Sequence, residues 1–397
     1  MRLRTDKALH SDGSRSWRQG TGLATQTRHE LGYVPALDGL RGIAILFVMG
    51  NHAPLRQYNS LLPGGFVGVD IFFVLSGFLI TTLLVQEFDR TGSISLRNFY
   101  LRRALRLGPA LIALLIVLCI SSFILFDYAR ARENCLDALI ALFYASNWVR
   151  VFSQNQLGLL AHTWSLSTEE QFYFLWPVIL LTLLRLTKKR YYIVTVAAVI
   201  ALLSWLTNLY LARQLASTPR LILHLSYGLD SKADMLMIGC MLGVVMSSGL
   251  MTENAKTLAK KSLVLLSPLS LAGLVAFSIS GNVLDHGLFY FGFVIIALLA
   301  AALILDVLVN TQSMVKRLLA FNGLVWPGSI SYGLYLWHFP IYMGMHDLGY
   351  TNWTVVLIGS PASLLAASFS YYGLEQPFLK LKKHFSTAQS AAHRRSA

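Results

Sequence analysis

Apolar stretches long enough to cross a bilayer recur along the whole of this 397-residue sequence. A transmembrane helix needs about 20 consecutive apolar residues, because the hydrocarbon core of a bilayer is about 30 Å thick. Only 13% of the residues are charged, against about 25% in soluble domains. We therefore predict an all-α, polytopic integral membrane protein. The apolar windows of spanning length lie at about 36–54, 66–86, 107–126, 165–186, 191–211, 230–250, 262–280, 288–309, 328–346 and 353–374.

A shorter apolar window at 134–149 is interpreted from the positions of the basic residues. With ten crossings and a cytoplasmic N-terminus, 25 of the 33 lysines and arginines fall in cytoplasmic segments. Counting 134–149 as a span would move every basic loop from Arg185 onward to the outside. Because cytoplasmic loops carry the excess of basic residues, we expect ten transmembrane helices with both termini in the cytoplasm. The segment 134–149 is then a re-entrant or interfacial segment.

The two ends of the chain differ in composition from the apolar region. Residues 1–32 are polar and carry both charge signs, which predicts a disordered cytoplasmic tail. Residues 379–397 are expected to form a basic cytoplasmic tail. The net charge of +14 could indicate a nucleic-acid partner, but no basic stripe alternates with exposed aromatic residues, so none is expected. The three cysteines lack metal-ligand spacing, and no metal site is predicted.

Several apolar windows carry ionisable residues that a simple membrane anchor would lack. Arg41 and His52 lie in the first window, about 16 Å apart along one helix. Such residues are costly in a membrane unless they are paired or hydrated, so they indicate a functional site. An arginine cluster at 102, 103 and 106 precedes the third window on the inner side. Residues predicted to lie in the outer half, where a shared polar cavity would explain them, are His52, Asp70, Ser167, Glu169, Glu170, Lys232, Asp234 and His338.

Each of these features also has a purely structural explanation when it is taken alone. His52 could be a packing histidine, the acidic residues could form ion pairs or complement a helix dipole, and the arginines could set the topology. Taken together they favour chemistry. A histidine oriented by a carboxylate is the usual general base for activating a hydroxyl group, and it could equally accept an acyl group transiently. Clustered arginines suit phosphates. The placement favours group transfer across a membrane.

Six motifs, in order, resemble those of the acyltransferase 3 family of integral membrane proteins. The resemblance extends from about residue 33 to residue 378, the predicted transmembrane domain. One local departure is Pro54 in Asn51-His52-Ala53-Pro54, where the family more often has Phe-His-Ala-Gly. The motifs are Tyr33–Ala44 with His52, Gly68–Ile80, Phe99–Arg106, His162–Tyr173, Ser329–His338 and Glu375–Pro377.

The resemblance implies O-acylation, most often O-acetylation, of a cell-surface or exported carbohydrate at the bacterial cytoplasmic (inner) membrane. The donor would be cytoplasmic acetyl-CoA or another acyl-CoA. By position, Arg41 and His52 match the family's Arg-x10-His pair. On this basis the predicted catalytic residues are His52, Glu169 and Asp70; the predicted CoA-binding residues are Arg41, Arg102, Arg103 and Arg106; and the predicted acceptor-binding residues are Ser167, Trp164, Glu170 and His338.

Other functions remain open from the sequence. The acceptor could be a small secreted compound such as a macrolide. A non-enzymatic transporter would also carry charges in its membrane segments, but transporters usually show internal repeats. The pattern at 35–80 is not repeated in the second half of the chain. A non-catalytic lipid-sensing scaffold is the third alternative.

Overall fold

The computed structural model of the protein describes residues 32–56, 59–153, 155–215, 218, 220–282, 285, 287–378 and 380. These residues are almost all helical, which confirms the predicted all-α class, with one short antiparallel hairpin of β1 and β2. The predicted tails lie outside the described residues, apart from Gly32 and Lys380. In chain order the elements are α1 (Pro35–His52), β1 (Pro54–Arg56), β2 (Asn59–Ser60), α2 (Val67–Thr91), α3 (Leu96–Leu125), α4 (Tyr128–Leu142), α5 (Ser146–Phe152), η1 (Gly158–Leu160), α6 (Thr163–Leu186), α7 (Tyr191–Gln214), α8 (Leu221–Tyr227), α9 (Leu229–Ser247), α10 (Glu253–Ser280), η2 (Leu288–Gly292), α11 (Phe293–Val309), α12 (Met314–Leu319), α13 (Asn322–Ser329), α14 (Ser331–Asp347), α15 (Asn352–Thr354), η3 (Val355–Gly359), α16 (Ser360–Phe369) and η4 (Ser370–Glu375).

Six helices among the described residues are long and apolar enough to cross a membrane: α2, α3, α7, α10, the continuous helix η2–α11 and the continuous helix from α15 through η4. The number becomes seven if the bent pair α4–α5 counts as one span. The predicted count of ten is therefore not confirmed. The other predicted windows coincide with α1, α6, α9 and the pair α13–α14. Helices α1, α6 and α9 are less apolar because they carry ionisable residues such as Arg41, Glu169 and Lys232, whereas α14, at 17 residues, is too short to span by itself.

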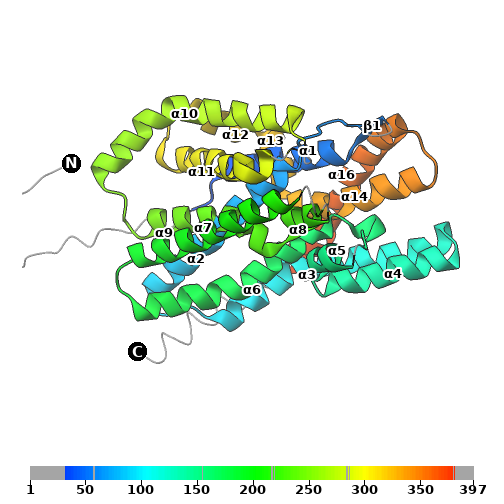
Figure 1. Ribbon diagram of the computed structural model, residues 1–397, viewed down its shortest axis with the longest axis horizontal. Helices are drawn as coiled ribbons and strands as arrows, with labels where there is room; N and C mark the ends of the chain where they lie inside the picture. The colour runs from blue at the N-terminus through cyan, green and yellow to red at the C-terminus, as the bar shows by residue number, and fades with distance from the viewer. Residues whose placement is uncertain are drawn as a thin grey trace, which may run out of the picture.

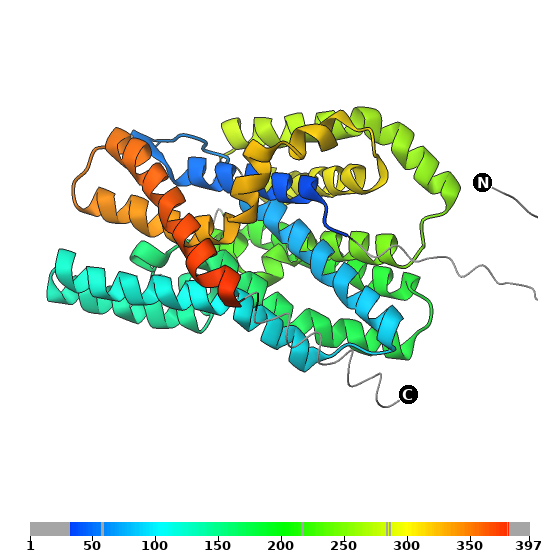
Figure 2. The same cartoon turned by 180° about the vertical axis from the view of Figure 1, so that it is seen from behind.

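The long helices α2, α6, α7 and α9 run along the long axis of the molecule (Figure 1). The α6–α7 and α9–α10 connections lie at one end of this axis, whereas β1 and the α14–α16 turn lie at the other. Helix α1 packs against α2, α13 and α14. Seen from behind, the red η4 segment crosses the cyan α3, with which it is in contact (Figure 2). The helix that carries both Arg41 and His52 is thus enclosed by other helices.

Local sequence explains where α1 and α2 end. Pro35 opens α1, where a missing N–H costs nothing and the ring favours the helical φ. Ala53 precedes Pro54, and a residue before proline is disfavoured in the helical conformation, so α1 stops directly after His52. Gly92, with φ of 74°, terminates α2 in the left-handed conformation that glycine adopts without strain. His52 is therefore the last residue of a helix and not part of a loop.

Helices α2 and α9 cross in close contact through two glycines. A Cβ added at Gly77 would lie 2.0 Å from the carbonyl oxygen of Leu236, and one at Gly239 would lie 2.1 Å from that of Val74. Small residues let membrane helices approach closely. The resulting van der Waals packing holds the helices together, since lipid provides no hydrophobic driving force for their association. This crossing aligns Asp70 on α2 with Lys232 on α9.

Replacing Gly77 by alanine should destabilise the protein, because the new methyl group would overlap the backbone of α9 and force the helices apart. Overpacking of this kind costs about 1–3 kcal/mol. The thermal unfolding midpoint in detergent measures the effect. Gly344→Ala is the matched control, since Gly344 lies within α14 and a Cβ there would meet nothing within 4 Å. Equal midpoints for the two variants would contradict this account of the crossing.

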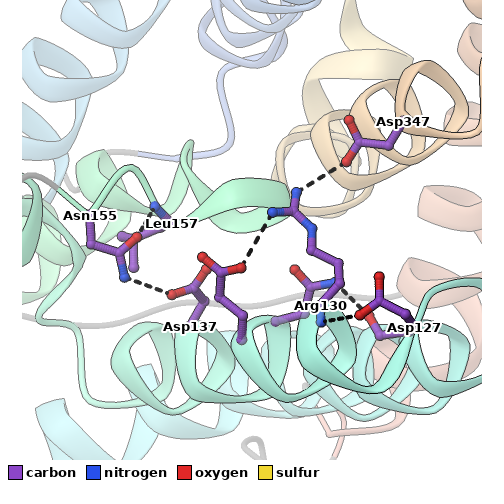
Figure 3. Close-up of polar contacts among 9 residues, drawn as sticks. Asp127, Arg130, Asp137, Asn155, Leu157 and Asp347 are labelled. Carbon is purple, nitrogen blue, oxygen red and sulfur yellow. Dashed lines mark hydrogen bonds and ion pairs between the residues drawn. The ribbon is translucent and has the colours of Figure 1, made fainter.

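The α3–α4 hairpin is attached to the neighbouring elements by polar contacts (Figure 3). Asp127 caps α4 by accepting a hydrogen bond from the backbone N–H of Arg130. The Arg130 side chain donates to Asp347 at the end of α14, over 3.2 Å. Asn155 donates to Asp137 over 3.1 Å, which holds the following loop against α4. These contacts hold the α3–α4 hairpin in place, and α5 enters the helix bundle from the end of α4.

The segment predicted to be re-entrant or interfacial, 134–149, forms the second part of α4 and the start of α5, which are bent by 117°. Ser167 holds α5 against α6, since its hydroxyl accepts from the backbone N–H of Ser146 over 3.2 Å and donates to the carbonyl of Thr163 over 3.0 Å. The bend brings Arg150 of α5 into the interior, where it is 9% exposed.

Candidate active site

Two cavities lie between the helices, and Val69 and Tyr335 line both of them. The first, here named the arginine cavity, has a volume of about 260 Å³. The second, the histidine cavity, has a volume of about 240 Å³. The polar side chains of the arginine cavity are Arg41, Ser76, Arg103, Arg106, Ser165, Glu169, Tyr173, Ser331, Tyr332 and Tyr335. Those of the histidine cavity are Asn51, His52, Asp70, Arg150, His162, Ser226, Tyr227, Lys232 and Tyr335.

The arginine cavity receives Arg41 from α1 and two arginines from α3. Arg103 and Arg106 are three residues apart on α3, a spacing that places them on the same face of a helix. The Arg103 guanidinium lies over the ring of Tyr173, 3.2 Å from its centroid, and pairs with Glu170 over 3.5 Å. Arg103 is therefore already engaged. Arg106 and Arg41, whose guanidinium lies 3.7 Å from Asp38, are the cations of this cavity that are more available to a ligand.

Carboxylates limit the positive charge of the arginine cavity without cancelling it. Glu169 is the carboxylate among its lining residues, and it accepts a hydrogen bond from Ser76 over 2.8 Å. Glu375 lies outside the lining and interacts electrostatically with Arg106 and Arg41. Three guanidinium groups thus face a space that one lining carboxylate shares. A polyanion such as a phosphate ester would complement this space.

The histidine cavity combines aromatic walls with charged side chains. Trp164 lies against Tyr227, with ring centroids 5.0 Å apart. Lys232 lies over the ring of Phe293, with Nζ 3.4 Å from the centroid, and interacts electrostatically with Asp70. Lys232 and Asp70 are each only 2% exposed. Aromatic faces with a few polar groups between them are suited to a ligand that carries both apolar faces and hydroxyl groups.

His52 at the end of α1 contacts a second histidine on α14. Its Nδ1 lies 2.8 Å from Nε2 of His338, and the His338 Nδ1 lies 2.8 Å from the carbonyl oxygen of Leu334. Phe339 packs its edge against His52, with centroids 4.8 Å apart. No carboxylate of the described residues is hydrogen-bonded to His52. Asp70 lies in the same cavity, whereas Glu169 lies in the arginine cavity.

Arg150 is the buried cation of the histidine cavity that has only neutral partners. It donates to the carbonyl of Ala161 over 2.8 Å, to Gln156 over 2.9 Å and to the hydroxyl of Tyr227 over 2.8 Å. Its guanidinium also lies 3.9 Å from the ring centroid of Tyr227. Among the described residues, no carboxylate is paired with it. A buried charge without a counterion is costly, so a negative charge that develops in this cavity would be stabilised there.

Tyr335 stands where the cavities adjoin, and its hydroxyl is held by two partners. It donates to the carbonyl of His162 over 2.6 Å, so it must accept from the hydroxyl of Ser165. The tyrosine is 8% exposed. With Val69 of α2, it forms the boundary across which a ligand in one cavity can approach a ligand in the other.

Eleven site residues were predicted from the sequence. Seven of them line one of the two cavities in the structure: Arg41, His52, Asp70, Arg103, Arg106, Trp164 and Glu169. The other four line neither cavity. Arg102 pairs with Glu87 over 3.2 Å in a partly exposed position, Ser167 holds α5, and Glu170 pairs with Arg103. His338, with no exposed surface, lies behind His52.

Residues that sequence reasoning did not select are Arg150, His162 and Tyr227. In the ten-crossing arrangement the sequence places Arg150 on the outer side and gives it no role in the site. A basic residue directly after an apolar segment too short to span was the one signal for it. His162 lies at the N-terminal end of α6, 2% exposed, and both of its ring nitrogens are without a hydrogen-bond partner among the described residues.

Metal ligation and disulfide formation find no support in the described part of the chain. It contains no group of three or more His, Cys, Asp or Glu side chains that could hold a metal ion. Cys119, Cys135 and Cys240 are all free thiols there.

Comparison with known proteins relates these motifs to one family. A family model described as an acyltransferase domain, acyltransferase 3, matches residues 34–372. A peptidoglycan O-acetyltransferase, OatA, of Listeria monocytogenes is 32% identical over 367 residues, which cover 89% of this chain and 57% of that protein. The O-acetyltransferase OatA of Staphylococcus aureus is 33% identical over 361 residues, 88% of this chain and 57% of its own length.

A putative O-acetyltransferase of S. aureus strain COL is 34% identical over 357 residues, 88% of this chain and 58% of that protein. The chain thus spans a little under three fifths of the length of these relatives. No solved structure matches the chain.

Proposed function

The chain belongs to the acyltransferase 3 family, and from this premise we propose that it is a membrane-embedded O-acyltransferase, in the first instance an O-acetyltransferase. An acyl group moves from cytoplasmic acyl-CoA to a hydroxyl group of a cell-surface or exported carbohydrate. The observation that carries the proposal is the adjoining of the two cavities at Val69 and Tyr335. A thioester held by its phosphates on one side can there meet a hydroxyl group beside an imidazole on the other.

The proposal includes ten crossings of a bacterial inner membrane, with both termini in the cytoplasm. Helices α1, α6, α9 and α13–α14 then span together with the six more apolar ones. Their charged residues face the interior of the bundle, where membrane helices tolerate them. The α6–α7 connection carries Lys188, Lys189 and Arg190, and it lies at the same end as the α9–α10 connection (Figure 1). The excess of basic residues supports the cytoplasm on that side.

On the donor side, Arg41, Arg103 and Arg106 bind the phosphates of acyl-CoA. Guanidinium groups suit this task because they hold phosphate oxygens through paired hydrogen bonds. The pantetheine arm then covers the distance from Arg41 to His52, which is about 16 Å along α1. Acetyl-CoA is the proposed donor, and no metal takes part in the proposed reaction.

On the acceptor side, His52 acts as the general base. Its Nε2 removes the proton of the acceptor hydroxyl while the hydroxyl oxygen attacks the thioester carbonyl carbon. The new C–O bond forms, the C–S bond breaks, and the proton passes from Nε2 to the departing thiolate, so the products are an ester and free CoA.

In the alternative mechanism, the same lone pair on His52 Nε2 attacks the thioester and carries the acyl group. Rapid-quench labelling with radioactive acetyl-CoA would then leave a protein adduct that a His52→Asn variant lacks.

Arg150 is proposed to stabilise the negative charge on the oxygen of the tetrahedral intermediate. Arg150→Gln should therefore lower kcat by about 10²-fold and leave the KM for acetyl-CoA nearly unchanged, because the charge develops only in the transition state. Steady-state kinetics with separately varied donor and acceptor measure this. A rise in the KM for the acceptor at unchanged kcat would contradict it and assign Arg150 to acceptor binding.

The acceptor is proposed to be a carbohydrate of the cell wall, a class to which the name of the Listeria relative points. The histidine cavity, about 240 Å³ in volume, is smaller than the roughly 300–1,000 Å³ of sites for drug-sized ligands. It suits one sugar residue at a time, with the rest of the acceptor outside.

The direct test uses the purified protein with radiolabelled acetyl-CoA and soluble peptidoglycan fragments. We expect ester-linked label on the fragments, released by mild base, and none with His52→Asn. Vesicles without acyl-CoA provide the comparison for a transporter. Uptake of the fragments there, with no ester formed in the presence of acetyl-CoA, would overturn the proposed function.

A further inference from the structure

The contact between His52 and His338 determines which nitrogen of each ring carries a proton. A backbone carbonyl can only accept, so the His338 Nδ1, 2.8 Å from the carbonyl oxygen of Leu334, must donate. A neutral His338 then has its lone pair on Nε2. That atom lies 2.8 Å from Nδ1 of His52, which must therefore donate to it. The one remaining lone pair, on Nε2 of His52, is left free at the cavity that His52 lines.

We propose that His338 is a positioning residue that holds His52 in the tautomer with a basic Nε2. The inference rests on the proposed function, in which His52 Nε2 takes the acceptor proton. His338 does not line either cavity and has no exposed surface, so its effect reaches the substrate only through His52. It is a second imidazole in the position where many general bases have a carboxylate.

Among the residues that the structure describes, the surroundings assign this task to His338. His162 also lies close to His338, with ring centroids 5.7 Å apart, but it is hydrogen-bonded to neither histidine. Phe339 contacts His52 edge-on and restricts its ring without offering an acceptor. Asp70, Arg150 and Lys232 line the same cavity, and none of them is hydrogen-bonded to either ring.

An uncharged hydrogen-bond acceptor for His52 suits a site that is buried inside a membrane-embedded helix bundle. A carboxylate behind His52 would add a further buried charge to a membrane-embedded bundle, at a cost of several kcal/mol per ion. The imidazole of His338 supplies an acceptor without that charge. Its own orientation is fixed within one helical turn, because the carbonyl of Leu334 belongs to the same helix.

Two variants of His338 separate the hydrogen-bond acceptor from simple packing. His338→Leu removes the acceptor, and kcat should fall roughly 10- to 100-fold with the KM for acetyl-CoA unchanged, less than the about 10²–10⁴-fold attributed to a general base itself. His338→Gln offers a side-chain oxygen to His52 Nδ1 and should keep activity within about 10-fold of the native protein. Tyr342→Phe, one turn further along α14, is the control and should retain full activity.

The ¹⁵N NMR spectrum of histidine-labelled protein gives a readout that packing alone would not change. The His52 signals, assigned by their loss in His52→Asn, should show a protonated Nδ1 and an unprotonated Nε2. In His338→Leu the two tautomers should both appear. Protonated Nε2 in the native protein, full activity of His338→Leu, or His338→Gln as inactive as His338→Leu would each overturn the inference. A protonated Nε2 would also exclude this atom as the general base, but none of these results would remove acyl transfer as the function, which fails instead if the native protein forms no ester.

Discussion

Replacing His52 by asparagine should lower kcat for acyl transfer by about 10²–10⁴-fold, the contribution expected of a positioned general base. Asparagine keeps a polar side chain of similar reach at the end of α1 but has no group that titrates. The measurement is the rate of ester formation at saturating acetyl-CoA and acceptor. Because the phosphates are held elsewhere, the affinity for CoA should change little.

The control for this variant is stability, since His52 also packs against Phe339. Equal thermal unfolding midpoints for the native protein and the variant would locate the loss in the chemical step. Transfer at the full rate by the folded variant would remove the imidazole from the mechanism altogether.

Replacing Arg41 and Arg106 together by glutamine should lower kcat/KM for acetyl-CoA by about 10²–10⁴-fold. Each charge-assisted hydrogen bond to a phosphate contributes about 1.5–3 kcal/mol, and a factor of ten corresponds to about 1.4 kcal/mol. These two arginines are chosen because Arg103 is already engaged with Tyr173 and Glu170. The loss should appear as a higher KM, since binding of the phosphates is the same before and during the reaction.

A donor without phosphates provides the control within the same experiment. S-acetyl-pantetheine should react poorly with the native protein and no worse with the double variant. Lys256→Gln, an exposed basic residue paired with Glu253, should leave the KM for acetyl-CoA unchanged. An equal loss with both donors would show that the two arginines support the fold and do not bind phosphate.

The helices themselves were predictable from the sequence because they depend on local hydrophobic length. Every predicted apolar window of spanning length coincides with a helix or a helix pair, although among the described residues six helices are long and apolar enough to span. The shortfall has two physical reasons: α1, α6 and α9 carry charged residues of the site such as Arg41, Glu169 and Lys232, and α14 is only 17 residues long. The charged residues of a site inside a membrane protein lower the mean hydropathy of the helices that carry them, and these helices are recognised in a sequence by that hydropathy.

The pairing of the site residues was not predictable, because it depends on the rotation of each helix about its axis. Glu169 or Asp70 was expected to orient His52, but Glu169 accepts a hydrogen bond from Ser76, and Asp70 lines the cavity of His52 without a hydrogen bond to it. His338 was expected to contact the acceptor, but it contacts His52, 286 positions earlier in the chain. Sequence spacing places two residues on one helix face, as for Arg103 and Arg106, but does not reveal which neighbouring helix that face meets.

The most direct test of transfer between the two cavities places donor and acceptor on opposite sides of a membrane. Proteoliposomes are loaded with radiolabelled acetyl-CoA, and peptidoglycan fragments are added outside. The account predicts ester-linked label on the outer fragments while acetyl-CoA stays inside, and none with His52→Asn. Ester formation only when donor and acceptor share one side of the membrane would contradict it.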